Sequence, residues 1–193
     1  MTLVLGVDPG HKGAFAVYDT DTERLVSVQD MPIWFQVVGN KKRPRLDPLA
    51  LADMFEMFEL QGVGLMVLEA VGGRPAQSAS AAFVFGYGLG LIYMCGLYSR
   101  IPVETVPARN WKRFMNVPGK GKADDTAIMQ RAGEMFPHDH QMFRTERGGK
   151  RIDRAEAAML AKYGGEHIIK RLGATADPDP EYRLTYASAD TGG

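Results

Sequence analysis

Two apolar segments of β-strand character each end in a carboxylate, and this feature constrains the fold of the chain most. Leu3–Val7 leads into Asp8, and Gly64–Leu68 leads into Glu69. Apolar runs of this length predict buried strands. A carboxylate at the end of such a strand is costly to desolvate unless a positive group meets it. Because a mixed sheet presents its ligand crevice at strand ends, we expect Asp8 and Glu69 to belong to a cation-dependent site.

The elements around these strands predict a mixed α/β fold. Short connections favour an antiparallel meander of the first strand with strands at 13–18 and 24–30. Residues 31–45 predict a loop that carries a basic cluster. We expect helices at about 48–60, 77–98, 107–114, 124–135 and 152–172, the last broken at Gly164–Gly165, and strands at 64–69 and 102–106. Residues 1–172 then form one domain, and 173–193 a disordered acidic tail.

Three features of the sequence indicate whether the protein is disulfide-bonded, secreted or membrane-bound. The chain of 193 residues has a single cysteine, Cys95, which excludes a disulfide framework and a cysteine-based zinc site. The first residues lack the basic and apolar regions of a signal peptide, so we expect an intracellular protein. Residues 75–99 carry no charge and are long enough to span a bilayer. Their Ala, Ser and Gly content favours a helix buried against the sheet, and we expect no membrane association.

Two further motifs do not meet the requirements of the sites that they suggest. The segment 118–124, PGKGKAD, has Asn116 and Ala123 where a Walker phosphate loop needs Gly and Ser or Thr. His138 and His140 have no third ligand at a zinc-site spacing. We therefore interpret 118–122 as a Gly- and Lys-rich loop and the histidine segment as a solvated loop.

A second pair of acids completes a candidate metal-binding set. Asp153 and Glu156 are three residues apart in the last predicted helix and so share one face. For each acid alone, a helix cap or a surface carboxylate is the favoured interpretation, and it is the set of four that favours a shared site. Asp8, Glu69, Asp153 and Glu156 together offer only oxygen ligands, which suit Mg²⁺, with Mn²⁺ as a substitute.

Five segments stand in a specific order along the chain. They read LGVDPGHKGAFAVYD, VLEAVGGRPAQSASAAFVFGYGLG, VPARNWKRFMNVPGKGKADD, AGEMFP and RIDRAEAAMLAKYG. Over residues 3–164 this order resembles a RuvC-type Holliday junction resolvase of the phage-like branch. The resemblance implies a ribonuclease-H-like fold, in which a mixed five-stranded sheet, a meander followed by parallel strands, is flanked by helices. It also implies a homodimer in a bacterial or phage-infected cytoplasm that nicks four-way DNA junctions with two metal ions.

The resemblance assigns roles to the four acids. Asp8 resembles the acid that bridges both metals, and Glu69 resembles the second ligand. Asp153 and Glu156 resemble the closing pair on the last helix. Glu156 stands where bacterial members have Asp, and phage-type members often have Glu. Bacterial members also carry an aromatic residue shortly after the second acid, and residues 70–76 contain none.

Polar and basic residues are the predicted DNA contacts, because Lys and Arg neutralise phosphates independently of base sequence. They are Lys12, Lys41, Lys42, Arg43, Arg45, Arg74, Gln77, Arg109, Lys112, Lys120 and Lys122. Three aromatic residues, Phe83, Phe85 and Trp111, favour core packing over contact with bases.

The sequence thus predicts a metal-dependent, structure-selective DNA endonuclease that resolves four-way junctions by paired, symmetric nicks. Two metal ions suit such phosphodiester hydrolysis because they activate a water and neutralise the leaving oxygen. One alternative is a nuclease with broader specificity for branched DNA or RNA/DNA hybrids. Another is a junction-binding protein without turnover, against which the complete acid set argues.

Overall fold

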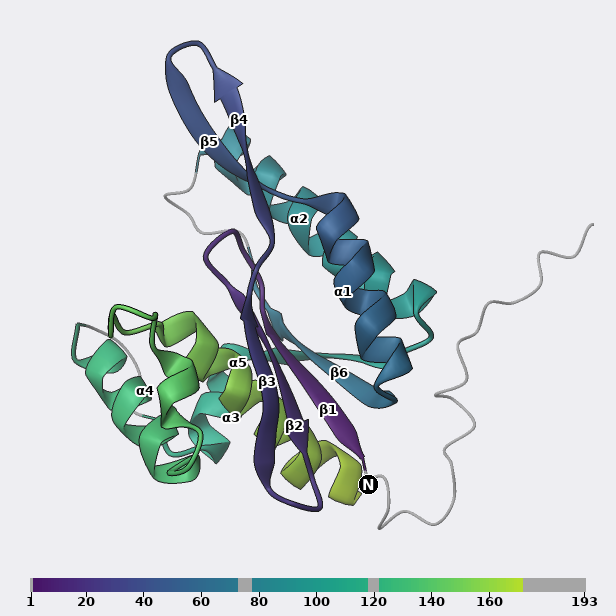
Figure 1. Ribbon diagram of the computed structural model, residues 1–193, viewed down its shortest axis with the longest axis vertical. Coiled ribbons are helices and arrows are strands. Elements are labelled where there is room, and N and C mark those ends of the chain that lie inside the picture. The colour runs from purple at the N-terminus through teal and green to yellow at the C-terminus, as the bar shows by residue number, and fades with distance from the viewer. Residues whose placement is uncertain (1, 73–77, 118–121, 172–193) are drawn as a thin grey trace, which may run out of the picture.

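The computed structural model describes residues 2–72, 78–117 and 122–171, shown as coloured ribbon in Figure 1. Several predictions fall outside this part of the chain. They concern Arg74, Gln77, Lys120, the side chain of Lys122 and the tail at 173–193.

A five-stranded sheet with the order β3-β2-β1-β6-β7 forms the centre of the molecule. Its first three strands are an antiparallel meander, and β6 and β7 then add in parallel to β1. The strands are β1 (Leu3–Asp8), β2 (Ala14–Asp19), β3 (Arg24–Asp30), β6 (Val63–Ala70) and β7 (Val103–Pro107). The predicted fold class is confirmed.

Helices cover both faces of this sheet (Figure 1). The chain packs α1 (Pro48–Leu60) and α2 (Ala79–Tyr98) on one face, in a core with Leu5 and Phe15. The opposite core contains Val4 and Ala16, since successive residues of a strand face opposite sides. The elements on that side are α3 (Ala108–Phe114), α4 (Lys122–Met135), a 3₁₀ turn (His140–Phe143) and α5 (Ile152–Tyr163).

The α5 helix approaches the sheet closely at Gly6. A Cβ at this position would overlap the Ala157 carbonyl oxygen and the Ala161 amide nitrogen. Instead of the predicted break, a π-helical turn (Gly164–Ile169) continues the helix. A Cβ at Gly164 would lie 2.5 Å from Val67 Cγ2, so this glycine too allows the helix to rest on the strands.

The prediction of a loop at 31–45 is wrong. These residues form a separate two-stranded hairpin, β4 (Ile33–Val38) and β5 (Lys41–Leu46). The turn Gly39–Asn40 joins the strands, and Gly39 has the positive φ of 58° that two-residue hairpin turns require. The run IWFQVV supplies the β-branched and aromatic residues typical of a strand. In Figure 1 the hairpin extends away from the main sheet.

The prediction that the helix at 77–98 is buried against the sheet holds for one stripe only. Gly88, Ile92 and Gly96 are buried, and a Cβ at Gly96 would lie 2.6 Å from Met66 Cε. Two of these three residues are glycines, and several large side chains of the helix, such as Tyr87 and Met94, lie outside. Phe83, predicted to pack in the core, is 76% exposed. Within the described residues α2 is also the one helix long and apolar enough to cross a membrane by length and composition.

Candidate active site

Asp8 and Glu69 lie at the same edge of the sheet. The strands β1 and β6 are parallel, and Val7 pairs with Leu68, the residues directly before the two acids. Asp153 and Glu156 lie on α5, which packs across β1 and β2. The ends of β1 and β6 and the first turns of α5 therefore meet at this edge of the sheet.

The electrostatics of Asp8 show that the four predicted acids converge. The pKa of the Asp8 carboxyl is raised to about 9, chiefly by burial and then by the charges of Glu156, Glu69 and Asp153 in that order. The positive charge of Lys112 acts in the opposite direction. Like charges that share a site disfavour the ionised form of the most buried one. Asp8 is thus the centre of a site that favours a bound proton or cation.

The short helix α3 supplies two polar groups to the acids. Lys112 Nζ lies 2.9 Å from Glu156 Oε1. The indole Nε1 of Trp111 donates a hydrogen bond of 3.0 Å to Glu69 Oε2. Trp111 is fully buried, as predicted, and this bond gives its N–H the partner that a buried indole needs. Lys112, predicted to contact DNA, thus has its ammonium group among the carboxylates.

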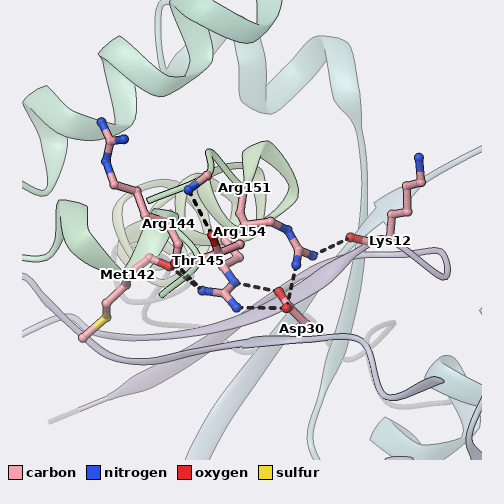
Figure 2. A network of polar contacts seen from close by, with 8 residues as sticks. Lys12, Asp30, Met142, Arg144, Thr145, Arg151 and Arg154 are labelled. Carbon is pink, nitrogen blue, oxygen red and sulfur yellow. Dashed lines mark hydrogen bonds and ion pairs between the residues drawn. The ribbon is translucent and has the colours of Figure 1, made fainter. Parts of the chain in front are cut away.

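A network around Asp30 fixes the start of α5 (Figure 2). Arg154 Nε and Nη2 donate to the two carboxylate oxygens of Asp30 at 2.6 and 2.9 Å. Arg151 Nη1 donates to the same carboxylate at 2.7 Å. These bonds hold the pKa of Asp30 below its ordinary value, chiefly through the Arg154 hydrogen bond. The bidentate geometry fixes direction as well as distance.

The same network reaches the segments beside the acids. Arg154 Nη1 donates to the carbonyl oxygens of Met142 and Arg144 at 3.1 and 2.9 Å. Arg151 Nη2 donates to the Lys12 carbonyl at 3.4 Å, while the Lys12 ammonium points away from the network (Figure 2). Arg154 lies between Asp153 and Glu156 in the chain, so its anchoring fixes the turn that carries both. Sequence reasoning missed this network, because Asp30 and Arg154 are 124 residues apart.

The acid set fits a hard divalent cation in donor type and in charge. All four side chains offer oxygen, and around the buried Asp8 carboxyl the charges of three other carboxylates outnumber the one ammonium of Lys112. Among the described residues, no three His, Cys, Asp or Glu side chains already stand in ligating positions around one point. Shared coordination of an ion would therefore require these carboxylates to turn toward it.

An open cavity of about 580 Å³ lies beside Glu69. It is lined by the end of β6 and by Gly86, Gly90 and Tyr93 of α2. A Cβ at Gly86 or Gly90 would meet nothing within 4 Å, so the cavity is open to solvent beside these two glycines. Of the predicted DNA contacts near the acids, Lys12 and Arg109 are exposed. The four basic residues of the hairpin lie apart from the acid cluster.

Comparison with solved structures identifies the fold. Thermus thermophilus RuvC in complex with a Holliday junction substrate matches with a TM-score of 0.59 and 13% identity, over 90% of this chain and 97% of that one. A second Thermus thermophilus RuvC structure matches with a TM-score of 0.50 and 14% identity, over 89% and 97% of the two chains. No family model matches the chain, and no curated protein matches it in sequence. The chain therefore has the ribonuclease-H-like fold of RuvC.

Proposed function

We propose that this protein is a metal-dependent endonuclease of the phage-like RuvC type that resolves four-way DNA junctions by paired nicks. The observation that carries the proposal is the convergence of Asp8, Glu69, Asp153 and Glu156 at one edge of the sheet. The likeness of the fold to a RuvC bound to a Holliday junction supports it.

The four acids would hold two Mg²⁺ or Mn²⁺ ions, which supply an activated water and neutralise the leaving oxygen of a phosphodiester. The surrounding residues prepare the acids for this task. Trp111 orients Glu69 through its hydrogen bond, and the Asp30 network orients the turn that carries Asp153 and Glu156. Lys112 provides positive charge beside Glu156, and the exposed Lys12 and Arg109 approach the phosphates of the substrate.

A homodimer is the second part of the proposal. Two symmetric nicks need two sites related by a two-fold axis, and a dimer supplies them. The exposed face of α2, which contains Phe83, Gly86, Tyr87, Gly90 and Met94, is the surface that we assign to the second copy. Its glycines allow close approach of two helices, and its aromatic residues offer the area to be buried.

The decisive test compares Asp8→Asn with Asp53→Asn, an exposed carboxylate on α1. Labelled four-way, Y-shaped and linear DNA, and an RNA/DNA hybrid, are incubated with each variant and Mg²⁺, and the nicks are mapped. We expect Asp8→Asn to lose cleavage by at least ~10³-fold while it still binds junctions, since a carboxylate in the reacting shell is worth several kcal/mol of barrier. Asp53→Asn should cut like the wild type.

The substrates separate the alternatives. Symmetric paired nicks confined to four-way DNA support a resolvase. Equal cleavage of Y-shaped DNA or of the hybrid would favour the broader nuclease. Junction binding without any Mg²⁺- or Mn²⁺-dependent cleavage by the wild type would leave a binding protein only, and full activity of Asp8→Asn would contradict the assigned site.

A further inference from the structure

The hairpin β4–β5 has two chemically different faces. Cross-strand pairs place Trp34 opposite Arg45, Gln36 opposite Arg43, and Val38 opposite Lys41. Because side chains alternate along a strand, these six residues share one face. We call it the basic face.

The other face of the hairpin is apolar. It contains Ile33, Phe35 and Val37 with their partners Leu46, Pro44 and Lys42. Leu46 anchors this face on α2, where a Cβ at Gly88 would lie 2.9 Å from Leu46 Cδ1. The basic face therefore points away from α2 at the base of the hairpin. Of the four basic residues in the cluster, only Lys42 belongs to the apolar face.

The register of the sheet places the base of the hairpin at the same edge of the sheet as Asp8, and the basic residues lie farther out along the hairpin (Figure 1). Asp8 pairs with Ala14, and Ala14 pairs with Asp30, so the end of β3 is level with the end of β1. The hairpin begins after Met31 and Pro32, and a hydrogen bond of 2.9 Å from the Asp47 amide to the Pro32 carbonyl closes its base. A polymer that reaches the acids can thus extend along the hairpin.

Charge and an exposed aromatic ring indicate the partner of the basic face. Residues 33–46 contain four basic residues and no acid, and Lys41 and Arg43 are exposed. Gln36 Oε1 accepts a hydrogen bond of 3.0 Å from Arg45 Nε, which holds that guanidinium on the face. The Trp34 ring is 45% exposed, although its Nε1 donates to the Leu46 carbonyl at 3.1 Å. A groove of duplex DNA accepts a two-stranded ribbon of this kind.

We propose that the basic face, through Trp34, Lys41, Arg43 and Arg45, binds a duplex arm of the DNA substrate outside the active site, and that Lys42 does not take part. The proposal deepens the proposed function and rests on it for the identity of the substrate. The proposal assigns Trp34 as a residue that stacks on or packs against the nucleic acid. It also separates Lys41, Arg43 and Arg45, which contact DNA, from Lys42, which lies on the other face and does not. A basic cluster that merely faces solvent would show no such division.

The matched pair Arg43→Ala and Lys42→Ala tests the division, because each removes one charge from adjacent exposed positions. Binding of the full-length protein to a labelled four-way junction is measured by anisotropy in EDTA over a range of NaCl concentrations. We expect Arg43→Ala to reduce the slope of log affinity against log salt by about 0.9, and Lys41→Ala/Arg43→Ala by about 1.8, as one phosphate contact is lost per residue. Lys42→Ala should leave the slope unchanged.

Trp34 offers a second readout that does not depend on charge. The chain has two tryptophans, and Trp111 is fully buried, so Trp34 is the exposed emitter. Junction binding in EDTA should quench the wild-type emission, and Trp34→Phe should lose most of that quenching. Trp34→Phe keeps an aromatic ring and should bind less than ~10-fold more weakly, since one stacking contact is worth about 1–3 kcal/mol and Phe retains part of it.

The outcomes separate the two proposals. Equal slopes for Arg43→Ala and Lys42→Ala, or quenching that persists in Trp34→Phe, would overturn the role of the basic face while wild-type binding still supports the proposed function. Wild-type protein that binds no branched or linear DNA would overturn both. Because all measurements are made in EDTA, a failure of metal-dependent cleavage does not affect the result.

Discussion

The helices α5 and α2 pack on opposite faces of the same sheet, but they differ in how much of their surface the described residues bury. Most of α5 is buried, and most of α2 is not. Of the 12 residues of α5, seven are buried, whereas α2 has 20 residues and only Gly88, Ile92 and Gly96 are buried. Where α5 crosses β1 at Gly6, there is no room for a Cβ, whereas Gly86 and Gly90 of α2 face open space.

The difference in burial between α5 and α2 corresponds to different roles of the two helices. The α5 helix carries Asp153 and Glu156, and tight packing with the Asp30 network holds these acids at fixed positions. The α2 helix keeps an apolar face without cover among the described residues, which is the face that we assign to a second copy. Damage to the α5 side should therefore affect stability and the candidate active site, and damage to the α2 face should affect the proposed assembly.

The largest contrast is expected between Gly6→Ala and Gly90→Ala. A methyl group at residue 6 must displace the backbone of α5, which should lower the free energy of unfolding by about 3 kcal/mol or more. At residue 90 no atom of the same chain lies within 4 Å, so the better helix propensity of Ala should raise the free energy of unfolding of the monomer by up to about 1 kcal/mol. On the face assigned to the second copy, the same methyl group should weaken the dimer. Urea unfolding of both variants measures the difference, and equal losses would contradict the asymmetry of the two faces.

A smaller effect is expected from Arg154→Ala, because it breaks the bidentate contact to Asp30 at a partly exposed position. We expect a loss of about 1–3 kcal/mol in the free energy of unfolding, typical of hydrogen bonds to a charged group. Cleavage should fall more than stability explains, because the turn with Asp153 and Glu156 loses its anchor. Arg147→Ala, an exposed arginine nearby, serves as the control. Wild-type cleavage by a folded Arg154→Ala protein would show that the network is structural only.

The Asp30 network should also affect how stability depends on pH below pH 6, and this effect should be smaller still. The pKa of Asp30 is lower in the folded state than its ordinary value of 3.8, so its contribution is present above that value and is lost as the pH falls through the folded pKa. Wild-type protein should therefore lose stability below about pH 4 more steeply than Arg154→Ala does. Unfolding midpoints measured between pH 2 and pH 6 on both proteins check this, and parallel curves would exclude Asp30 as a contributor.

The smallest effect on folding is expected on the α2 face. Tyr87→Ser/Met94→Ser removes two exposed side chains, so the free energy of unfolding of the monomer should change by less than about 0.5 kcal/mol. The mass from light scattering should instead fall from twice 21.2 kDa to that of one chain. Leu60→Ser, an exposed apolar residue on α1, should remain dimeric. If the wild type is monomeric, or if the double variant is still a dimer, the assignment of the α2 face to the dimer interface is wrong.

Local sequence patterns were sufficient to predict the sheet. Leu3–Asp8 and Arg24–Asp30 form strands with the predicted bounds, because short apolar or alternating runs between turn residues specify strands locally. The hairpin was missed because the basic residues and Pro44 of β5 masked its signal. The run at 33–38, followed by the two-residue turn Gly39–Asn40, was the pattern that identifies it.

The positions of Asp8 and Glu69 at strand ends were predictable for the same local reason, but their surroundings were not. Asp8 and Glu69 each follow an apolar strand, which marks them in the sequence. No local pattern connects Asp30 to Arg154, or Trp111 to Glu69, since these bonds depend on how distant elements pack. The exposed face of α2 was misjudged because apolar composition indicates that a helix needs cover and does not say which surface provides it.

The position of β1 in the middle of the sheet has a consequence for biosynthesis. This strand is synthesised before the other strands of its sheet, and β2 and β3 follow at once to protect one of its edges. Its other edge stays unpaired until β6 (Val63–Ala70) has been made, and α5, which covers one of its faces, comes later still. An unpaired edge on an apolar strand is a template for association with other chains. Nascent chains that stall before β6 should therefore be the species of this protein most prone to aggregate and most dependent on chaperones.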